Sequence, residues 1–125
     1  MDGDQINVED SILLSIKKLL GMEPEEFDQY DVDIMLHINT VIETLNQIGV
    51  DMPDGFSVTD KTVLWSDYLN RTKYSQIKDS IKSYLYLKVR LVFDPPTNTS
   101  LINAINESIN ELEWRIRQWV EFYDE

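Results

Sequence analysis

The fold class of this chain is decided by residues 99–123, which read TSLINAINESINELEWRIRQWVEFY. Apolar residues recur in this stretch at alternating steps of three and four, the heptad spacing of a helix with one apolar seam. The seam residues are Ile102, Ile105, Ile109, Leu112, Ile116, Trp119 and Tyr123. We expect a helix from Ser100 to Phe122, capped by Thr99 or Ser100 and on the order of 35 Å long. A seam of this length needs a partner helix.

A shorter helix is predicted over residues 12–20, at the other end of the chain. Asn7, with Asp10 three residues later, is typical of a capped helix start. Gly21 is a natural stop, because glycine readily adopts the left-handed conformation that ends many helices. The apolar residues at helical spacing are Ile12, Leu13, Ile16, Leu19 and Leu20.

The second predicted helix runs from Asp31 to Ile48 and ends before a glycine. Its single apolar stripe consists of Ile34, Ile38, Val41, Ile42, Leu45 and Ile48. Residues 49–60 then contain the turn-forming sequence DMPDG, so we expect a loop there that is longer than a helical bundle usually needs. Phe56, Ser57 and Val58 are a candidate extended piece, which is too short to make a sheet by itself.

Two more helices are predicted between this loop and the final helix. A short one over Lys61–Leu69 has Thr59 or Asp60 as its candidate cap, and a longer one covers Ser75–Phe93. The apolar stripe of the longer helix consists of Ile77, Ile81, Tyr84, Leu85, Val89 and Val92. The sequence DPP at residues 94–96 then ends it, because proline cannot donate a ladder hydrogen bond and disfavours helical geometry in the residue before it.

The expected fold is therefore all-α: a small bundle of about four to five helices with a longer loop at about 49–60. The length of 125 residues suits a single domain covering 1–125, in which residues 1–9 and 120–125 are candidate extended tails. The chain has no cysteine, so disulfides and thiolate chemistry are excluded. No apolar run approaches the roughly 20 residues that span a bilayer, and the acidic start MDGD is the reverse of a signal peptide.

The formal net charge of −12 belongs entirely to the first half of the chain. Residues 1–60 hold fourteen acidic and two basic residues, whereas residues 61–125 hold nine of each. This excess argues against nonspecific nucleic-acid binding or an anionic membrane surface, both of which need positive charge. The densest acidic part consists of Glu23, Glu25, Glu26, Asp28, Asp31 and Asp33. It is read either as a solvated loop leading to a helix N-terminus or as a surface that repels phosphate. A calcium loop fails on the spacing.

Nothing in the sequence points to catalysis. His37 is the only histidine, and it lies at the border of the second helix's apolar stripe, where a structural role is the simpler interpretation. There is no glycine-rich phosphate loop, and a zinc site would need at least three carboxylates. We therefore predict no enzymatic activity, no cofactor and no metal.

Residues placed away from the expected core are candidate contacts between subunits or with a partner. Trp119 is expected in the core, whereas Trp114 falls off the seam. The candidate contacts are Trp114, Tyr86, Lys82, Lys88, Arg90 and Phe56. The basic residues of the fourth helix are read either as a solvated face or as a surface that meets the acidic region of the next copy. Head-to-tail contacts of this kind can close into a ring.

Four stretches in order resemble the small head–tail connector, or adaptor, proteins of tailed bacteriophages and prophages. Residues 10–21 read DSILLSIKKLLG, and residues 37–41 read HINTV, followed by Leu45, Gln47, Ile48 and Gly49. The most distinctive stretch is YLYLKVRLVFDPP at residues 84–96, and INELEWR at residues 109–115 resembles the family's closing helix. The similarity covers about residues 10–117 and leaves the two ends of the chain outside it.

This resemblance implies a structural virion protein without catalysis or cofactor. Its implied partners are further copies of itself in a ring, the phage portal, and a tail-side connector or tail-completion protein. A dodecamer is our working size, although the sequence does not determine the number of copies. DNA would pass through the ring unbound, and the candidate channel-facing acids are Glu23, Glu25, Glu26 and Asp28. The implied location is the virion neck, with the host cytoplasm during assembly and no membrane contact. An acidic helical binding module, such as a regulator or DNA mimic, is the alternative.

Overall fold

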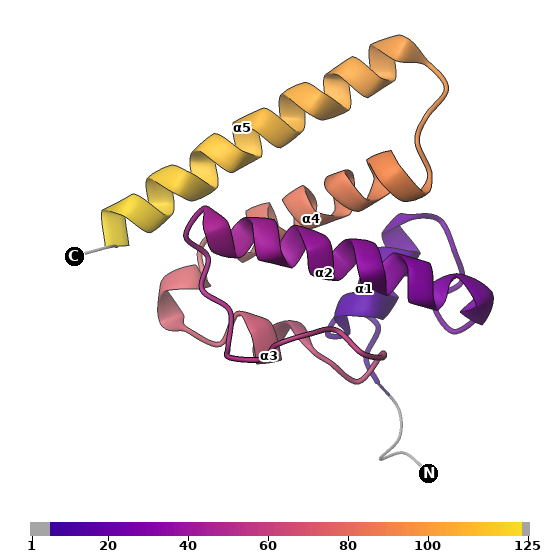
Figure 1. The fold of residues 1–125 in the computed structure, drawn as a ribbon, viewed down its shortest axis with the longest axis horizontal. Helices are drawn as coiled ribbons and strands as arrows, with labels where there is room; N and C mark the ends of the chain where they lie inside the picture. The colour runs from indigo at the N-terminus through magenta and orange to yellow at the C-terminus, as the bar shows by residue number, and fades with distance from the viewer. Residues whose placement is uncertain (1–5, 124–125) are drawn as a thin grey trace.

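The computed structural model describes residues 6–123, which form a chain of helices without a strand in that range (Figure 1). The elements are α1 (Ile12–Leu19), η2 (Asp28–Tyr30), α2 (Asp31–Gln47), α3 (Trp65–Tyr68), η3 (Thr72–Tyr74), α4 (Lys78–Phe93) and α5 (Thr99–Tyr123). The all-α prediction is confirmed. Residues 120–123 continue α5, while residues 1–5 and 124–125, which fall in the candidate tails, lie outside the described residues.

The cap of α1 is Ser11 and not Asn7, so that sequence prediction is wrong. The Ser11 backbone is extended, with φ −81° and ψ 130°, and its hydroxyl accepts a hydrogen bond of 3.1 Å from the Leu14 amide. The Asn7 side chain instead accepts a hydrogen bond of 2.9 Å from the Glu9 amide, within the preceding turn. Serine and asparagine side chains both favour helix caps and turns. Here Ser11 caps α1, and Asn7 stabilises the turn before it.

The helix predicted over Lys61–Leu69 forms only as the single turn of α3. The chain just before α3 pairs with the start of α1, because the Ile12 amide donates a hydrogen bond of 3.2 Å to the Val63 carbonyl. Asp60 is not a helix cap: its carboxylate accepts a hydrogen bond of 2.8 Å from the Thr62 amide, in a turn. Tertiary pairing therefore replaces the local helical preference in this segment.

The two long C-terminal helices begin one to three residues away from their predicted starts. The single turn η3 precedes α4, so α4 begins at Lys78 and not at Ser75. The cap of α5 is Asn98, whose side-chain oxygen accepts a hydrogen bond of 3.1 Å from the Leu101 amide. Neither Thr99 nor Ser100 is the cap, since both are already helical.

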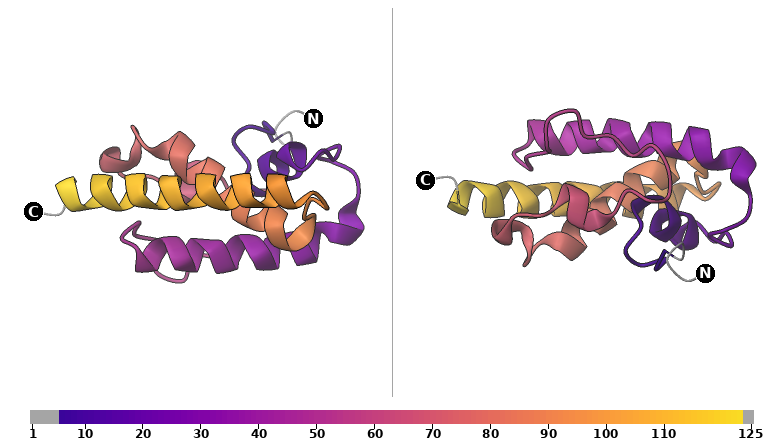
Figure 2. Two further views of the ribbon diagram at one scale, coloured as in Figure 1. Left: turned by 90° about the horizontal axis from the view of Figure 1, so that it is seen from above. Right: turned by 90° about the horizontal axis from the view of Figure 1, so that it is seen from below.

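The core lies where α2 and α4 pack together, with α1 and α3 covering it from one side (Figures 1 and 2). The predicted stripe of α2 is buried except for the half-buried Ile48. The predicted stripe of α4 is buried except for Val92, which is 59% exposed and corrects the prediction. In Figure 1, α5 begins well away from the C-terminal end of α4, so the two helices diverge at the end of α4 to which Val92 belongs.

The seam of α5 packs on α4, which is the partner helix that the heptad spacing required. Its buried members are Ile105, Ile109 and Ile116; Ile102, Leu112 and Trp119 are half-buried. Tyr123 is 40% exposed, so its assignment to the core seam is wrong. The end of α5 also meets the end of α2. Gly49 has φ +115° there, and a Cβ at this position would lie 2.5 Å from a Val120 methyl carbon.

The long loop predicted at residues 49–60 is present and is held against the body of the molecule. Asn39 of α2 binds both backbone groups of Val58: its side-chain oxygen accepts from the Val58 amide at 2.8 Å, and its side-chain nitrogen donates to the Val58 carbonyl at 3.1 Å. This pairing imitates a neighbouring strand and explains why an extended segment is stable here without a sheet.

Candidate functional site

The outer surface of α5 exposes Trp114, as its position off the seam predicts. The side chain is 62% exposed. Two ion pairs at i, i+4 spacing surround it: Glu111 with Arg115 at 2.8 Å, and Glu113 with Arg117 at 3.1 Å. These pairs are solvent-exposed and contribute little stability, but they restrain the side chains that border the indole. Trp114 is therefore an apolar side chain on a charged helix surface.

The basic residues of α4 named as candidate contacts have different surroundings. Lys82 lies over the Trp65 ring, with its ammonium 5.3 Å from the ring centroid. Lys88 lies over the Tyr84 ring at 5.5 Å. Arg90 is half-buried. The two lysines thus pack on aromatic rings from different elements, and cation–π attraction adds to their placement.

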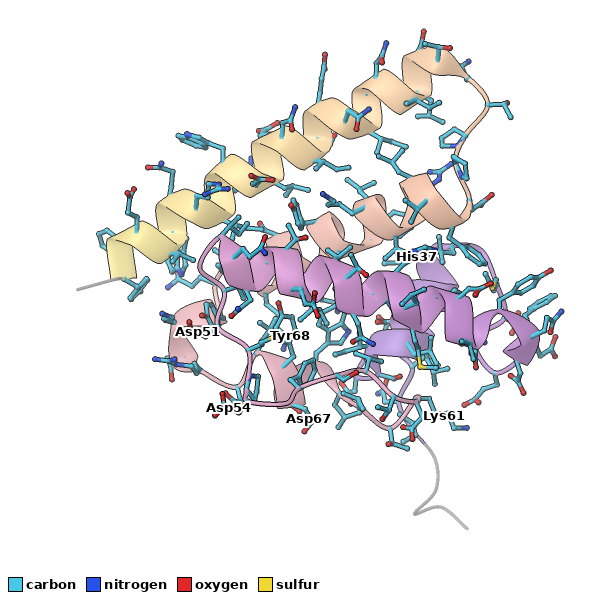
Figure 3. The ribbon with its side chains drawn as sticks, in the orientation of Figure 1. His37, Asp51, Asp54, Lys61, Asp67 and Tyr68 are labelled. Atoms are coloured by element: carbon cyan, nitrogen blue, oxygen red, sulfur yellow. The ribbon has the colours of Figure 1, made fainter. Side chains whose placement is uncertain are left out.

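Tyr86 and Phe56, two other candidate contacts, have different surroundings. Tyr86 is half-buried and lines a cavity of about 670 Å³ between α1 and α4. Phe56 stacks on Tyr68 with a distance of 5.3 Å between the ring centroids. Phe56 therefore packs within its own chain and holds the long loop on α3, near the labelled Tyr68 in Figure 3.

The four candidate channel-facing acids, Glu23, Glu25, Glu26 and Asp28, are all exposed. They lie in the linker between α1 and α2 and in η2. One of them has a basic partner among the described residues: Glu25 pairs with Lys61 at 2.9 Å. The others leave this end of the molecule strongly negative, which fits both interpretations of the acidic cluster.

This acidic linker is held by Lys17, whose role the sequence analysis missed. The Lys17 side chain is completely buried, and its ammonium lies 2.8 Å from the Asp31 carboxylate. It also donates a hydrogen bond of 2.6 Å to the Glu26 carbonyl. The lysine therefore joins the last turn of α1, the linker and the first turn of α2. No local pattern distinguishes it from the exposed Lys18 beside it.

Sequence reasoning also missed the exposed side chains of Val32 and Leu36 on α2. Their exposed fractions are 73% and 62%. They are four residues apart, and this spacing on the side opposite the buried stripe was the available signal. His37 is half-buried on the side of α2 toward α4 (Figure 3), which agrees with the border position predicted for it.

Two buried phenols have strongly raised pKa values. The Tyr84 hydroxyl donates a hydrogen bond of 3.0 Å to Glu113 of α5. Burial, together with this hydrogen bond and the charge of Glu113, raises the pKa of Tyr84 well above its usual value. Burial likewise raises the pKa of Tyr68, whose hydroxyl has no hydrogen-bond partner among the described residues. Both phenols stay protonated at neutral pH.

The described residues contain no cluster of three or more His, Asp or Glu side chains that could hold a metal ion. None of the helices described is both long and apolar enough to cross a membrane. The chemistry present consists of exposed apolar side chains on charged helix faces, with one strongly acidic end. The class that these observations define is a small all-α protein with exposed apolar side chains on charged helix faces.

Comparison with known families identifies this class more closely. The family model for phage connector proteins matches residues 12–121, almost the whole described chain. The chain therefore belongs to the phage connector protein family, and its role is structural, in association with other phage head and tail proteins of the virion. No curated protein and no solved structure gives a match to this chain.

Proposed function

We propose that this chain forms a ring between the phage portal and the tail and extends the DNA channel. The observation that carries the proposal is the family match over residues 12–121. The exposed apolar side chains support it, because a protein that assembles with copies and partners keeps such surface available for burial.

The proposal assigns the linker acids Glu23, Glu25, Glu26 and Asp28 to the wall of the channel. Phosphate groups are repelled by a negative surface, so DNA would pass along such a wall without being held. The charge distribution supports this assignment, since the linker end of the molecule has many exposed acids and Lys61 is the base that pairs with one of them.

The proposal assigns the outer face of α5 around Trp114 to a contact with a partner protein. Exposed tryptophans are costly in solution and are enriched among the residues that dominate protein interfaces. The portal and the tail-side connector or tail-completion protein are the two candidate partners.

Co-assembly with the portal protein encoded by the same genome tests the proposal. The two proteins are mixed at high concentration and low salt, and the product is examined by light scattering and negative-stain imaging. Annular complexes, and the presence of this chain in purified virions, support the connector ring. If the proteins fail to associate and virions lack the chain, the proposal is wrong. A stable monomer that binds a basic host protein would then support the acidic binding module instead.

A further inference from the structure

The outer face of α2 has an apolar centre that the described residues leave uncovered. Val32 and Leu36 are adjacent on this face, and their exposed fractions are 73% and 62%. Asp33 and Glu43 of α2 and Asp28 of the preceding turn are exposed near them. The helix contains no lysine or arginine. This surface, the outer α2 face, is therefore apolar at its centre and acidic around it.

A groove follows α4 on the side where α1 packs. It consists of two adjoining cavities of about 470 and 670 Å³, which share Glu9, Asp79 and Lys82 in their walls. The larger cavity is lined by Leu19, which is 51% exposed, and by Tyr86. The groove, called here the α1–α4 groove, thus has an apolar part of its own that is open to solvent.

The charge of the α1–α4 groove is complementary to that of the outer α2 face. Its basic groups are Lys18, Lys78 and Lys82 in the walls and Arg90 one helical turn beyond Tyr86. Its acidic groups are Glu9, Asp10 and Asp79. The walls of the groove therefore hold as many bases as acids, with Lys18 paired to Glu9 at 2.9 Å and Arg90 just beyond them. The outer α2 face has only acids, so its apposition to the groove brings those acids to Lys78 and Lys82.

The two surfaces lie on opposite sides of the molecule. In both views of Figure 2, α2 runs along one edge, α1 lies at the other, and α4 and α5 lie between them. A contact between unlike surfaces on opposite sides of one chain joins copies head to tail, and such a contact closes into a ring when the rotation between neighbours allows it.

We propose that the outer α2 face of one copy docks in the α1–α4 groove of the next copy. Val32 and Leu36 then pack against Leu19 and Tyr86, as an amphipathic helix packs in an apolar groove. The inference rests on the proposed function, because it names the contact from which the connector ring is built.

A contact of this size is weak between two isolated copies. Stable interfaces bury roughly 800 Å² on each partner, more than two exposed side chains and their surroundings supply. In a closed ring each copy makes the contact twice, once with each surface. Association of the free chain is therefore expected to depend on concentration and to weaken as salt screens the charges.

Sedimentation velocity over a concentration series at low salt tests the contact with three variants. Val32→Gln/Leu36→Gln removes the apolar centre of the outer α2 face. Leu19→Glu places an acid in the groove. Val92→Gln is the matched control, because Val92 is equally apolar and 59% exposed but lies outside both surfaces. We expect association to weaken by about tenfold or more in the first two variants and to be unchanged in the control.

Mixing the first two variants provides the sharper result. The Val32→Gln/Leu36→Gln chain keeps its groove and the Leu19→Glu chain keeps its α2 face, so one intact contact remains between them. At the highest concentrations of the series, the mixture is expected to sediment as a one-to-one dimer that grows no further, whereas neither variant alone forms one. The inference is overturned if the wild-type chain does not self-associate, if the control loses association equally, or if the mixture gives no dimer.

Portal co-assembly separates failure of this contact from failure of the proposed function. If the Val32→Gln/Leu36→Gln chain self-associates like wild type while both chains assemble on the portal, the inference falls and the connector function stands. If the wild-type chain self-associates through these surfaces but neither binds the portal nor occurs in virions, the contact stands and the connector function falls.

Discussion

The buried ion pair of Lys17 and Asp31 allows a quantitative test of how the acidic linker is held. Replacing Asp31 by alanine leaves the Lys17 ammonium buried, with the Glu26 carbonyl as its remaining described partner. Removing one member of a fully buried pair costs about 3–5 kcal/mol of unfolding free energy. The Asp31 side chain is 25% exposed, so water relieves part of this cost. We expect a loss of about 2–3 kcal/mol.

The matched variant Lys17→Met removes the charge and keeps the length of the side chain. The change also leaves Asp31 without its partner, but this side chain is 25% exposed and lies in the first turn of α2, where water and the helix dipole stabilise its charge. We therefore expect Lys17→Met to cost less than Asp31→Ala, about 1–2 kcal/mol. The double variant Lys17→Met/Asp31→Ala should then be nearly as stable as Lys17→Met alone. The effect of Asp31→Ala on the wild-type chain is compared with its effect on the Lys17→Met chain. The difference is the coupling energy of the ion pair, without the cost of losing an acid at the N-terminus of α2.

Urea unfolding followed by circular dichroism at 222 nm measures these differences. For a denaturant slope of roughly 1–2 kcal/mol per molar, Asp31→Ala should lower the unfolding midpoint by about 1 M or more. A coupling energy below about 0.5 kcal/mol between the two substitutions would contradict the reasoning, because Asp31 would then not be what compensates the burial of Lys17.

Three further predictions concern α5 and the buried phenols. Trp114→Ala should weaken assembly with partners while the isolated chain keeps its helical circular dichroism spectrum; unfolding of the monomer would show that Trp114 belongs to the core. Gly49→Ala should lower the unfolding free energy in urea by about 2–4 kcal/mol, because of positive-φ strain and the clash with Val120. Adding Val120→Ala to this variant should restore the part of the loss that is due to the clash, and not the part that is due to the strain. Tyr68 and Tyr84 should resist ionisation near pH 10 in absorbance titrations at 295 nm, and because their folded pKa values are raised, stability should fall as the pH rises above 10; normal titration of all tyrosines would contradict this.

The existence of the helices could be predicted from the sequence, whereas several of their ends could not. Periodicity identifies α2, α4 and α5 because each buries one stripe against another helix. The ends depend on contacts between distant segments. The pairing of Val63 with Ile12 shortens α3, and the cap of α1 is Ser11 although Asn7 has the equally suitable side chain.

The candidate contacts could be predicted less well than the fold. Trp114 is exposed because its position relative to the seam fixes its direction. Charge alone groups Lys82 with Lys88 in the sequence, whereas the aromatic rings under the two lysines come from different elements. The burial of Lys17 depends on how the linker folds back over α1, which no local spacing encodes.

The three tryptophans of the chain occupy three depths and therefore form a built-in set of optical reporters. Trp65 is buried, and its indole donates a hydrogen bond of 2.9 Å to Ser15 of α1. The half-buried Trp119 donates one of 2.6 Å to the Lys73 carbonyl, across the junction of α5 with η3. Trp114 faces solvent. Variants that keep one tryptophan each would let fluorescence separate unfolding of the core, undocking of α5 and capture of a partner, without any attached label.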